Sequence, residues 1–471
     1  MAPASELCFL RATDLARLLR ARKVSAREVM EAHLARIEAI DPSVNAIVTF
    51  QPERALEAAV RADERMSRGE GVGHLHGLPV AHKDLANTAG VRTTMGSKLF
   101  REHVPLSDDL IVERLRDAGA ISVGKTNVPE FGAGSQTYNE VFGETRNPWD
   151  VRMTCGGSSG GAAVALSTGM LPIADGSDMG GSLRNPGGFC NVVGFRPSPG
   201  RVPAVPSLHG WETLAVLGPM ARTVEDTALL LSAMAGPDSR SPIALEEPGE
   251  RFLAPLARDF SGVRIAWSRD LGGLPVDPRV SEVIDGRRET FETLGCELVD
   301  EEPDWSDADE IFQVLRAWTF AQTFAAASDE ELECLKETLV WNIEKGRQLS
   351  GADVARAEVL RTRLFSRLHE FMQGCEFLIL PVSQVPPFDV KQRWVKEIAG
   401  VPMETYIDWM KSCYYVSVTG HPAVSVPCGF TPEGLPVGVQ IVGRHRDDFG
   451  VLQLAYAFQE ATGLWRERPP L

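Results

Sequence analysis

The sequence predicts an α/β protein that folds as one large domain over residues 1–471. Between residues 75 and 201, short apolar runs alternate with Gly-rich turns and helical stretches, a pattern typical of proteins built on an α/β sheet. The alternation continues from residue 223 to residue 298, and no linker, repeat or low-complexity tract divides the chain. With 44% hydrophobic and 24% charged residues, the chain can bury a globular core without disulfides or metal.

The N-terminal region is predicted to be helical. Ser25 and Glu28 have the spacing of a capping box, and apolar residues follow at helical intervals. We expect this helix to end at Asp41 and Pro42. A second helix is predicted over residues 52–68, before the α/β region begins.

The later elements are predicted from the spacing of apolar residues, which differs between helices and strands. Helices are predicted over residues 108–118 and 447–462, and the stretch from 304 to 372 is mostly helical and polar. Pro381 is expected to end the strand that precedes it, because proline cannot donate to a sheet ladder. The predicted strands are 78–81, 120–123, 171–174, 263–267, 377–380, 423–426 and 437–442.

The net charge argues against two classes of partner. The chain has 48 Lys and Arg residues and 64 Asp and Glu residues, which gives a formal charge of −16, and no run of basic residues stands out. Such a surface repels nucleic-acid phosphates and anionic lipids, so we expect neither a nucleic-acid partner nor a membrane partner.

The cysteines and the N-terminus indicate a cytoplasmic location. Eight cysteines are scattered from Cys8 to Cys428 without a CxxC motif, as expected for reduced thiols in the cytosol. The first ten residues lack the basic and apolar regions of a signal peptide. No stretch approaches the ~18 uninterrupted apolar residues that argue for a transmembrane helix.

One motif imitates a nucleotide-binding site. Residues 119–126, GAISVGKT, match the P-loop pattern letter for letter. A P-loop needs a flexible turn between a strand and a helix, whereas residues 120–123 are themselves apolar and β-prone. Pro129 also lies close to where the phosphate-binding helix would begin. We therefore predict no nucleotide site here and no cofactor.

Two further patterns carry competing hypotheses. Residues 157–161, GSSGG, fit the nucleophile-elbow pattern, which would make Ser159 the nucleophile. An elbow follows a strand and needs an acid and a His downstream, but residues 150–155 form a short strand at best. The downstream histidines, none in a distinguishing context, are His209, His369, His421 and His445. His74 and His76 have the spacing of a metal pair but lack a third ligand at fitting spacing, so no metal is predicted.

A longer pattern occupies residues 155–203. Two turns rich in Gly and Ser, GGSSGG at 156–161 and GGS at 180–182, flank an Ala-rich, helix-prone stretch and an apolar strand. Turns in an α/β sheet account for the glycines but not for the hydroxyls inside both turns. The consecutive glycines before Ser182 let backbone N–H groups converge on one point, as an oxyanion hole requires.

This stretch resembles the signature of the amidase-signature family, in which a GGSSGG turn is followed by a GGS turn and an Arg two residues on, here Arg184. The similar motifs, in the same order, are GLPVAHKD at 77–84, GKTN at 124–127, TRNPWD at 145–150, HPAVSVP at 421–427 and GLPVGVQIVG at 434–443. The resemblance implies that family's fold, an α/β domain whose central mixed β-sheet is sandwiched by helices. Residues 75–205 would form its signature core.

The resemblance also implies a catalytic triad, with Ser182 as nucleophile, Ser158 as a bridging serine in a cis peptide, and Lys83 as base. A serine hydroxyl is a weak nucleophile until a neighbour takes its proton. A lysine can take that proton only when it is neutral, so burial must lower its pKa. The amides implied as oxyanion donors are those of Met179, Gly180, Gly181 and Ser182.

The sequence departs from the family pattern in three places. Met179 stands where the family usually has Thr, but the oxyanion hole needs only its backbone. Arg196 replaces the usual Lys after Cys190, and Gly187 and Gly188 replace a pair of alanines. We expect these changes to reshape the floor of the pocket and to leave the triad intact.

The helical excursion over residues 304–415 is expected to supply much of the substrate pocket. It contains many aromatic residues, which suit an apolar or aromatic substrate, although packing within the helices explains them equally well. These residues are Trp305, Trp318, Phe320, Trp341, Trp394, Tyr406, Trp409, Tyr414 and Tyr415. The loop at 134–142, GSQTYNEVF, resembles that of bacterial aryl acylamidases and urethanases. The expected substrate-binding residues are Tyr138, Cys155, Gly157, Trp394 and Trp409.

The resemblance favours a stand-alone hydrolase of amides, anilides or aryl carbamates, with a small-molecule substrate. Two alternatives remain. The chain could be the glutaminase subunit of a tRNA-dependent amidotransferase, or a non-catalytic member that acts as a binding module. The filled positions of the triad argue against the second. A homodimer is the default expectation for the oligomeric state.

Overall fold

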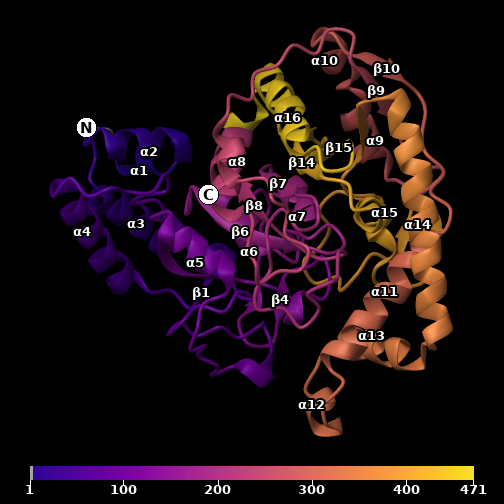
Figure 1. The fold of residues 1–471 in the computed structure, drawn as a ribbon, viewed down its shortest axis with the longest axis horizontal. Helices are drawn as coiled ribbons and strands as arrows, with labels where there is room; N and C mark the ends of the chain where they lie inside the picture. Colours follow the sequence, from indigo (N-terminus) through magenta and orange to yellow (C-terminus); the bar gives the residue numbers. More distant parts are fainter. Residues whose placement is uncertain (1–3) are drawn as a thin grey trace.

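A mixed sheet of eight strands, in the order β10-β9-β11-β15-β14-β7-β8-β6, forms the centre of the molecule (Figure 1). The structure is a computed structural model and describes residues 4–471. Strands β9, β10 and β11 run parallel, and the remaining neighbours pair antiparallel. The strands of this sheet are β6 (Ile173–Asp178), β7 (Val193–Arg196), β8 (Val216–Ala221), β9 (Arg264–Trp267), β10 (Glu297–Val299), β11 (Phe377–Pro381), β14 (Ala423–Phe430) and β15 (Pro436–Gly443).

A smaller sheet lies beside the edge strand β6. Its order is β1-β3-β2, with β2 parallel to β3 and β1 antiparallel. The Asp175 carboxylate on β6 accepts from the Lys83 amide at 2.8 Å and contacts His82 Nδ1 at 2.6 Å, and both of these residues lie on β2. These bonds fix the end of β2 against β6. The remaining strands are β1 (Ile47–Val48), β2 (Pro79–Lys83), β3 (Ile121–Thr126), β4 (Tyr138–Asn139), β5 (Gly143–Glu144), β12 (Glu397–Ile398) and β13 (Val401–Pro402).

Helices cover both faces of the large sheet. On β11, Phe377 and Ile379 join one hydrophobic core, and Leu378 and Leu380 join another. Because successive strand side chains point to opposite faces, the two cores lie on opposite sides of the sheet. The first core includes residues of α2 to α6, α8 and α16, and the second includes residues of α11, α14 and α15. The chain is therefore a single α/β domain with a mixed sheet between helices, as the sequence predicts.

The N-terminal helices and the helical excursion occupy opposite sides of the ribbon, with the sheet between them (Figure 1). The helices are α1 (Ala4–Leu7), α2 (Ala12–Arg20), α3 (Ala26–Val44), α4 (Pro52–Ser67), α5 (Leu110–Asp117), α6 (Gly160–Ser167), α7 (Arg184–Phe189), α8 (Val224–Met234), α9 (Pro278–Asp285), α10 (Arg288–Thr293), α11 (Ala308–Thr323), α12 (Asp329–Glu333), α13 (Glu337–Gln348), α14 (Gly351–Gly374), α15 (Lys411–Thr419) and α16 (Asp448–Thr462).

Of the two proline predictions, the one at Pro42 was wrong. The Ser25–Glu28 capping box starts α3 as expected, but the helix continues through Pro42 to Val44. The turn after Pro42 is held because the Asn45 amide donates to the Asp41 carbonyl and the Asp41 carboxylate accepts from the next two amides. Pro381 is the last residue of β11, opposite Val439, so this strand ends at the proline as predicted.

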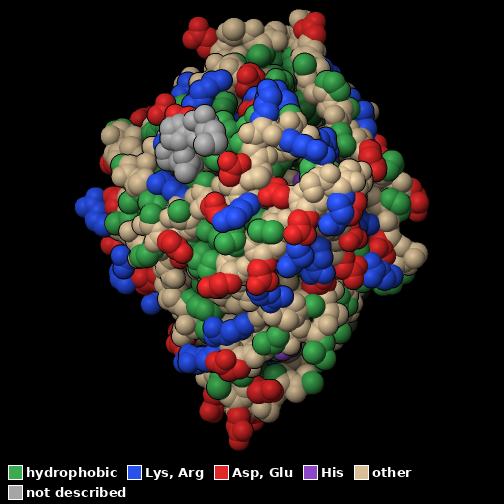
Figure 2. All heavy atoms as spheres, turned by 90° about the vertical axis from the view of Figure 1, so that its left-hand side faces the viewer, with side chains coloured by type: hydrophobic (Ala, Val, Ile, Leu, Met, Phe, Trp, Pro, Cys, Tyr) green, Lys and Arg blue, Asp and Glu red, His purple; other side chains and the backbone are tan. Residues whose placement is uncertain are grey.

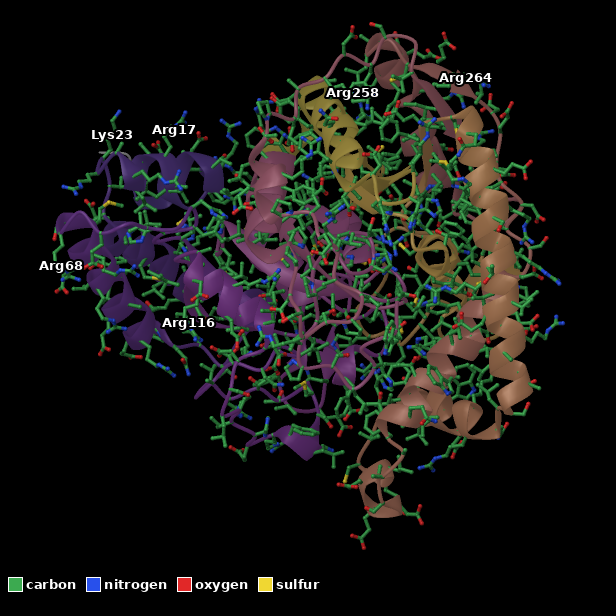
Figure 3. All side chains as sticks on the ribbon, viewed as in Figure 1. Arg17, Lys23, Arg68, Arg116, Arg258 and Arg264 are labelled. Atoms are coloured by element: carbon green, nitrogen blue, oxygen red, sulfur yellow. The ribbon has the colours of Figure 1, made fainter. Side chains whose placement is uncertain are left out.

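The surface shows no concentration of one charge on the face drawn in Figure 2, where basic and acidic side chains are interspersed. In Figure 3, Arg17, Lys23, Arg68 and Arg116 project from the N-terminal helices, whereas Arg258 and Arg264 lie on the other side of the molecule. Among residues 4–471, no helix is long and apolar enough to cross a bilayer.

Candidate active site

The two Gly/Ser turns and the end of β2 converge on one site. Ser158 and Ser159 directly precede α6, Ser182 lies between β6 and α7, and Lys83 is the last residue of β2. Lys83 and Ser158 are each 2% exposed, and Ser182 is 7% exposed. The structure thus brings together three side chains that are up to 99 positions apart in the sequence.

The Lys83 ammonium group is surrounded by hydroxyl groups. Lys83 Nζ lies 2.8 Å from Ser158 Oγ, 2.8 Å from Ser159 Oγ and 2.9 Å from Ser177 Oγ. The Ser177 carbonyl oxygen is 3.4 Å away. All of these partners are uncharged, so none of them stabilises the protonated lysine as a carboxylate contact would.

Burial lowers the pKa of Lys83 from 10.5 to about 7. The charges of Asp178 and Asp175 act in the opposite direction and favour the ammonium form. Removal from water dominates because it disfavours the charged form of the group. Lys83 is therefore neutral in a substantial fraction of molecules near neutral pH, which is the state that a general base requires.

Backbone bonds position Ser182 beside the first Gly/Ser turn. The Ser159 amide donates to the Ser182 carbonyl at 3.1 Å, and the Gly157–Ser158 peptide is cis. Within the described residues, no hydrogen bond joins the Ser158 and Ser182 hydroxyls. The absence of this bond does not exclude a shared role, because hydrogen bonds between catalytic groups are often long in unliganded enzymes and shorten when substrate binds.

The turn at residues 179–182 presents backbone amides toward the same region. Among residues 4–471, the amides of Met179, Gly180 and Ser182 have no protein acceptor, whereas the Gly181 amide donates to Asp178 Oδ1 at 2.9 Å. Gly181 has a φ of +110°, and a side chain there would collide with Cys413. Glycine is thus required at this position for the turn to form.

Asp178 holds that turn in place. Its carboxylate accepts from the amides of Gly181 and Leu183 and from the guanidinium groups of Arg184, at 2.8 and 3.0 Å, and Arg196, at 3.2 Å. All three charged side chains are fully buried. Although burial by itself would raise the pKa of Asp178, the two arginines hold it well below its usual value. The aspartate is therefore ionised and rigidly placed.

The expected substrate-binding residues fall into two groups. Cys155 and Trp409 are buried, and Trp409 packs against the rings of Phe189 and Phe388. Burial raises the pKa of the Cys155 thiol to about 12, so it is not ionised. A side chain at Gly157 would meet the backbone of Gln136 and the hydroxyl of Thr137.

Tyr138 and Trp394 form the second group and are partly exposed. The guanidinium of Arg393 lies 4.2 Å from the Tyr138 ring centroid, and Lys396 Nζ lies 3.1 Å from that of Trp394. Both rings therefore have charged neighbours and access to solvent. Their role in substrate binding stays a prediction.

The remaining motifs take structural positions. Residues 121–126 of the P-loop imitation form β3, and Lys125 donates to the Ala86 carbonyl and, at 2.8 Å, to Thr88 Oγ1. No strand leads directly into the turn at Ser158 and Ser159, because the strand before it, β5, ends at Glu144, so the elbow geometry is absent among the described residues. His74 Nε2 lies 2.9 Å from Ser232 Oγ. In the part of the chain that the structure describes, no group of three or more His, Cys, Asp or Glu is arranged to hold a metal ion.

The sequence did not predict that four residues would lie near Lys83. These residues are Ser159, Asp175, Ser177 and Asp178. Ser177 and Asp178 directly precede the second Gly/Ser turn, and Ser159 belongs to the first. Their position inside or next to the two Gly/Ser turns was the only sequence feature that could have marked these three residues as part of the site. The contact with Lys83 depends on how β2 lies against β6, which no local pattern reveals.

Comparison with known proteins identifies the family. The profile described as Amidase matches residues 28–452, which is most of the chain. The chain belongs to the amidase-signature family. It is 35% identical over 467 residues to an acylamidase of Rhodococcus erythropolis, covering 98% of each chain. It is also 33% identical over 482 residues to a glutamyl-tRNA(Gln) amidotransferase subunit of Desulfatibacillum aliphaticivorans, covering 96% of this chain and 97% of that protein.

A solved structure supports the same assignment. The crystal structure of a bacterial aryl acylamidase of the amidase-signature family superposes with a TM-score of 0.90 at 28% identity, and 98% of each chain is covered. The amidase described here is therefore an enzyme of a hydrolase family, and its fold matches that family over nearly its whole length.

Proposed function

We propose that this amidase hydrolyses the C–N bonds of amides, anilides or aryl carbamates with Lys83, Ser158 and Ser182 as its catalytic triad. The observation that carries the proposal is the placement of Lys83. Its amine is buried, has a pKa of about 7, and lies 2.8 Å from Ser158 Oγ, next to the turn that holds Ser182. A neutral amine in contact with a hydroxyl relay is the arrangement that activates a serine.

The proposed reaction proceeds through an acyl-enzyme. Ser182 Oγ attacks the carbonyl carbon while its proton passes to Ser158, whose own proton passes to the neutral amine of Lys83. The relay then runs in reverse and protonates the leaving nitrogen, so the C–N bond breaks. Water, activated by the same relay, hydrolyses the ester on Ser182 and restores the free enzyme.

The turn before Ser182 is proposed to bind the oxyanion that forms at the carbonyl. The unpartnered amides of Met179, Gly180 and Ser182 are suited to this role, because donors held in place before reaction lose no energy in reorganising. The Gly181 amide, also an expected donor, is bonded to the ionised Asp178. We assign Gly181 chiefly the function of shaping the turn.

Similarity to the acylamidase and the aryl acylamidase supports small aryl amides as substrates. We include carbamates because Ser182 Oγ could attack their carbonyl carbon and release their nitrogen in the same way as for amides. We propose no nucleic-acid or membrane partner and no cofactor. A homodimer in the cytoplasm remains our expectation, and the burial of seven of the eight cysteines suits a reducing compartment.

A glutaminase component of an amidotransferase is the alternative function, because the amidotransferase protein is nearly as similar in sequence as the acylamidase. Such a component would prefer glutamine and would act with partner chains. A non-catalytic binding module is the other alternative, and the occupied positions of Lys83, Ser158 and Ser182 argue against it.

The test compares purified wild type with Ser182→Ala on p-nitroacetanilide, an aryl carbamate, a primary amide and L-glutamine. We expect the single chain to hydrolyse the aryl substrates, and the substitution to lower kcat by roughly a thousandfold or more. Ser207→Ala, in an exposed loop, is a control that should leave kcat unchanged. Activity on glutamine alone would instead support the amidotransferase alternative, and equal rates for Ser182→Ala would remove Ser182 as nucleophile.

A further inference from the structure

Three cationic side chains gather around two tyrosine rings. Lys336 Nζ lies 5.5 Å and the Arg393 guanidinium 4.2 Å from the centroid of the Tyr138 ring. The Arg316 guanidinium lies 5.4 Å from the centroid of the Tyr406 ring and donates to its hydroxyl at 2.7 Å. The three cations come from α11, the residue before α13, and the loop before β12.

The two rings belong to one cluster. A β-carbon placed on Gly134 would lie 3.8 Å from Tyr406 Cε2 and 3.9 Å from Lys336 Nζ. Gly134 has a φ of +122°, which disfavours any side chain there. Tyr406 and Lys336 therefore both lie within contact distance of the same point beside Gly134.

The cluster lies next to the catalytic serines. Lys336 Nζ donates to the Ala133 carbonyl, and a β-carbon on the preceding residue, Gly132, would lie 3.5 Å from Ser158 Oγ. Gly132 and Gly134 are both partly exposed. Since two residues span at most about 7 Å of extended chain, the cluster is within reach of a substrate whose carbonyl sits at Ser182.

Positive charge in the cluster is only partly neutralised. Among the described residues, no carboxylate forms a salt bridge with Lys336 or Arg316. Glu130 instead accepts from the Lys336 amide and from Ser97 Oγ, both uncharged donors, at 2.7 Å. Glu144 lies 3.9 Å from Arg393 but is bonded more closely to Lys391, at 2.6 Å. Burial, together with the charges of Arg316 and Arg393, lowers the pKa of Lys336 to about 7 despite the opposing charge of Glu130. Lys336 is therefore only partly charged near pH 7 without a ligand, and a carboxylate bound beside it would favour the ammonium form.

We propose that Lys336, Arg393 and Arg316 form a subsite that binds a carboxylate of the amide substrate. The inference rests on the proposed function and narrows its substrate class to amides that carry an acidic group on the acyl or the amine portion. A carboxylate accepts charge-assisted hydrogen bonds from ammonium and guanidinium groups. The Tyr138 and Tyr406 rings would contact the apolar part of the same substrate.

The test measures the preference for an anion over a neutral compound of nearly the same shape. On the amine side, 4-acetamidobenzoate is compared with 4-acetamidoacetophenone. On the acyl side, succinanilic acid is compared with 4-oxo-N-phenylpentanamide. In at least one pair, we expect wild type to favour the carboxylate by about tenfold or more in kcat/KM, chiefly through KM.

Substitution of Lys336 should reduce that preference. We expect Lys336→Met to lower the ratio of kcat/KM for the anion to that for its neutral counterpart by about tenfold, and Lys336→Arg to restore part of it. Lys345→Met is the matched control, since Lys345 is an exposed lysine on α13 that lies over Trp341 and outside the cluster. Its ratio should equal that of wild type.

Two results would overturn the subsite: no preference for either carboxylate in wild type, or equal loss on anion and neutral compound in Lys336→Met. A binding measurement separates this outcome from failure of the proposed function. Calorimetry with Ser182→Ala should show tighter binding of the preferred carboxylate than of its neutral counterpart, even if wild type hydrolyses neither. Equal affinities would contradict the inference independently of catalysis.

Discussion

Two buried lysines occupy neighbouring strands and have different surroundings. Lys83 ends β2, and Lys125 lies on β3, where it pairs with His82. Burial lowers the pKa of Lys83 to about 7 and that of Lys125 to about 8. Lys83 contacts three serine hydroxyls, whereas Lys125 contacts a carbonyl and one threonine hydroxyl.

The difference teaches that burial alone does not make a lysine a base. A lowered pKa supplies the neutral amine, but catalysis also needs a proton donor that leads to the substrate. In the proposed relay, Ser158, 2.8 Å from Lys83 Nζ, is such a donor. The Ala86 carbonyl beside Lys125 has no proton to give, and the Thr88 hydroxyl donates to that same carbonyl at 3.3 Å. Lys125 therefore holds the chain between Ala86 and Thr88 in place.

Replacing each lysine by methionine should separate the two roles, with the largest effect on activity. Lys83→Met is expected to lower kcat by about a thousandfold because the general base is lost. Lys125→Met is expected to keep most of the activity but to lower the free energy of unfolding by about 2–4 kcal/mol, since buried groups lose their partners. Steady-state kinetics and urea unfolding of both variants measure this. Similar losses of activity would show that the two lysines do not differ in role.

Replacing the aspartate near each lysine, Asp178 for Lys83 and Asp84 for Lys125, extends the comparison to stability. Asp178→Asn leaves Arg184 and Arg196 as uncompensated buried charges, so we expect the free energy of unfolding to fall by about 3–5 kcal/mol and kcat to fall with it. The Asp84 carboxylate accepts from the backbone amide and the hydroxyl of Thr94, so Asp84→Asn should cost roughly 1 kcal/mol. Thermal and urea unfolding test the order, and a larger effect at Asp84 would contradict it.

Both lysines should make the free energy of unfolding rise with pH. Their folded pKa values lie below the unfolded value, so between the two pKa values unfolding takes up a proton and stability rises with pH. The window is pH 7 to 10.5 for Lys83 and pH 8 to 10.5 for Lys125. Removing either lysine should reduce the slope there by up to about 1.4 kcal/mol per pH unit.

Activity should distinguish the lysines where stability does not. In wild type, kcat/KM should rise with pH through an inflection near 7, the pKa of Lys83. Lys125→Met should keep that inflection. A profile that falls as pH rises through 7 would mean that the protonated lysine is the active form.

The hydroxyl partners should give the smallest effects. We expect Ser177→Ala to lower kcat several-fold and to shift the inflection of the pH profile, because Lys83 loses one contact of 2.9 Å. Thr88→Ala removes the equivalent contact of Lys125, at 2.8 Å, and should leave the profile unchanged. Equal shifts in the two variants would argue that the effect is general rather than specific to Lys83.

Local patterns were sufficient for most of the fold. The capping box at Ser25 starts α3, and the strands expected to start at residues 78, 120 and 171 begin within one or two positions of them, as β2, β3 and β6. The end of α3 was harder to predict, because the turn after Pro42 is held by bonds from Asp41 to residues beyond the expected end. Periodicity reports burial and says little about which neighbours compensate a proline.

For the site, too, local patterns predicted some features and not others. The two Gly/Ser turns and the resemblance they carry marked Lys83, Ser158 and Ser182 for attention, and the structure brings these residues together. The contact of Lys83 with Ser177 joins residues 94 positions apart and depends on the alignment of two sheets. Likewise, no pattern separated the buried Trp409 from the partly exposed Trp394. Contacts of this kind arise only when distant segments pack.

The most direct test of the account is site-specific labelling with a fluorophosphonate, followed by mass spectrometry of the peptides. Ser182 Oγ should displace fluoride and carry the label, at a rate that rises with pH through about 7 in wild type and in Lys125→Met. Lys83→Met should be labelled far more slowly. In Ser182→Ala, the peptide that contains position 182 should carry no label. A label on Ser158 or Ser159, or equal rates in Lys83→Met and wild type, would contradict the assignment of Ser182 as a nucleophile activated by Lys83.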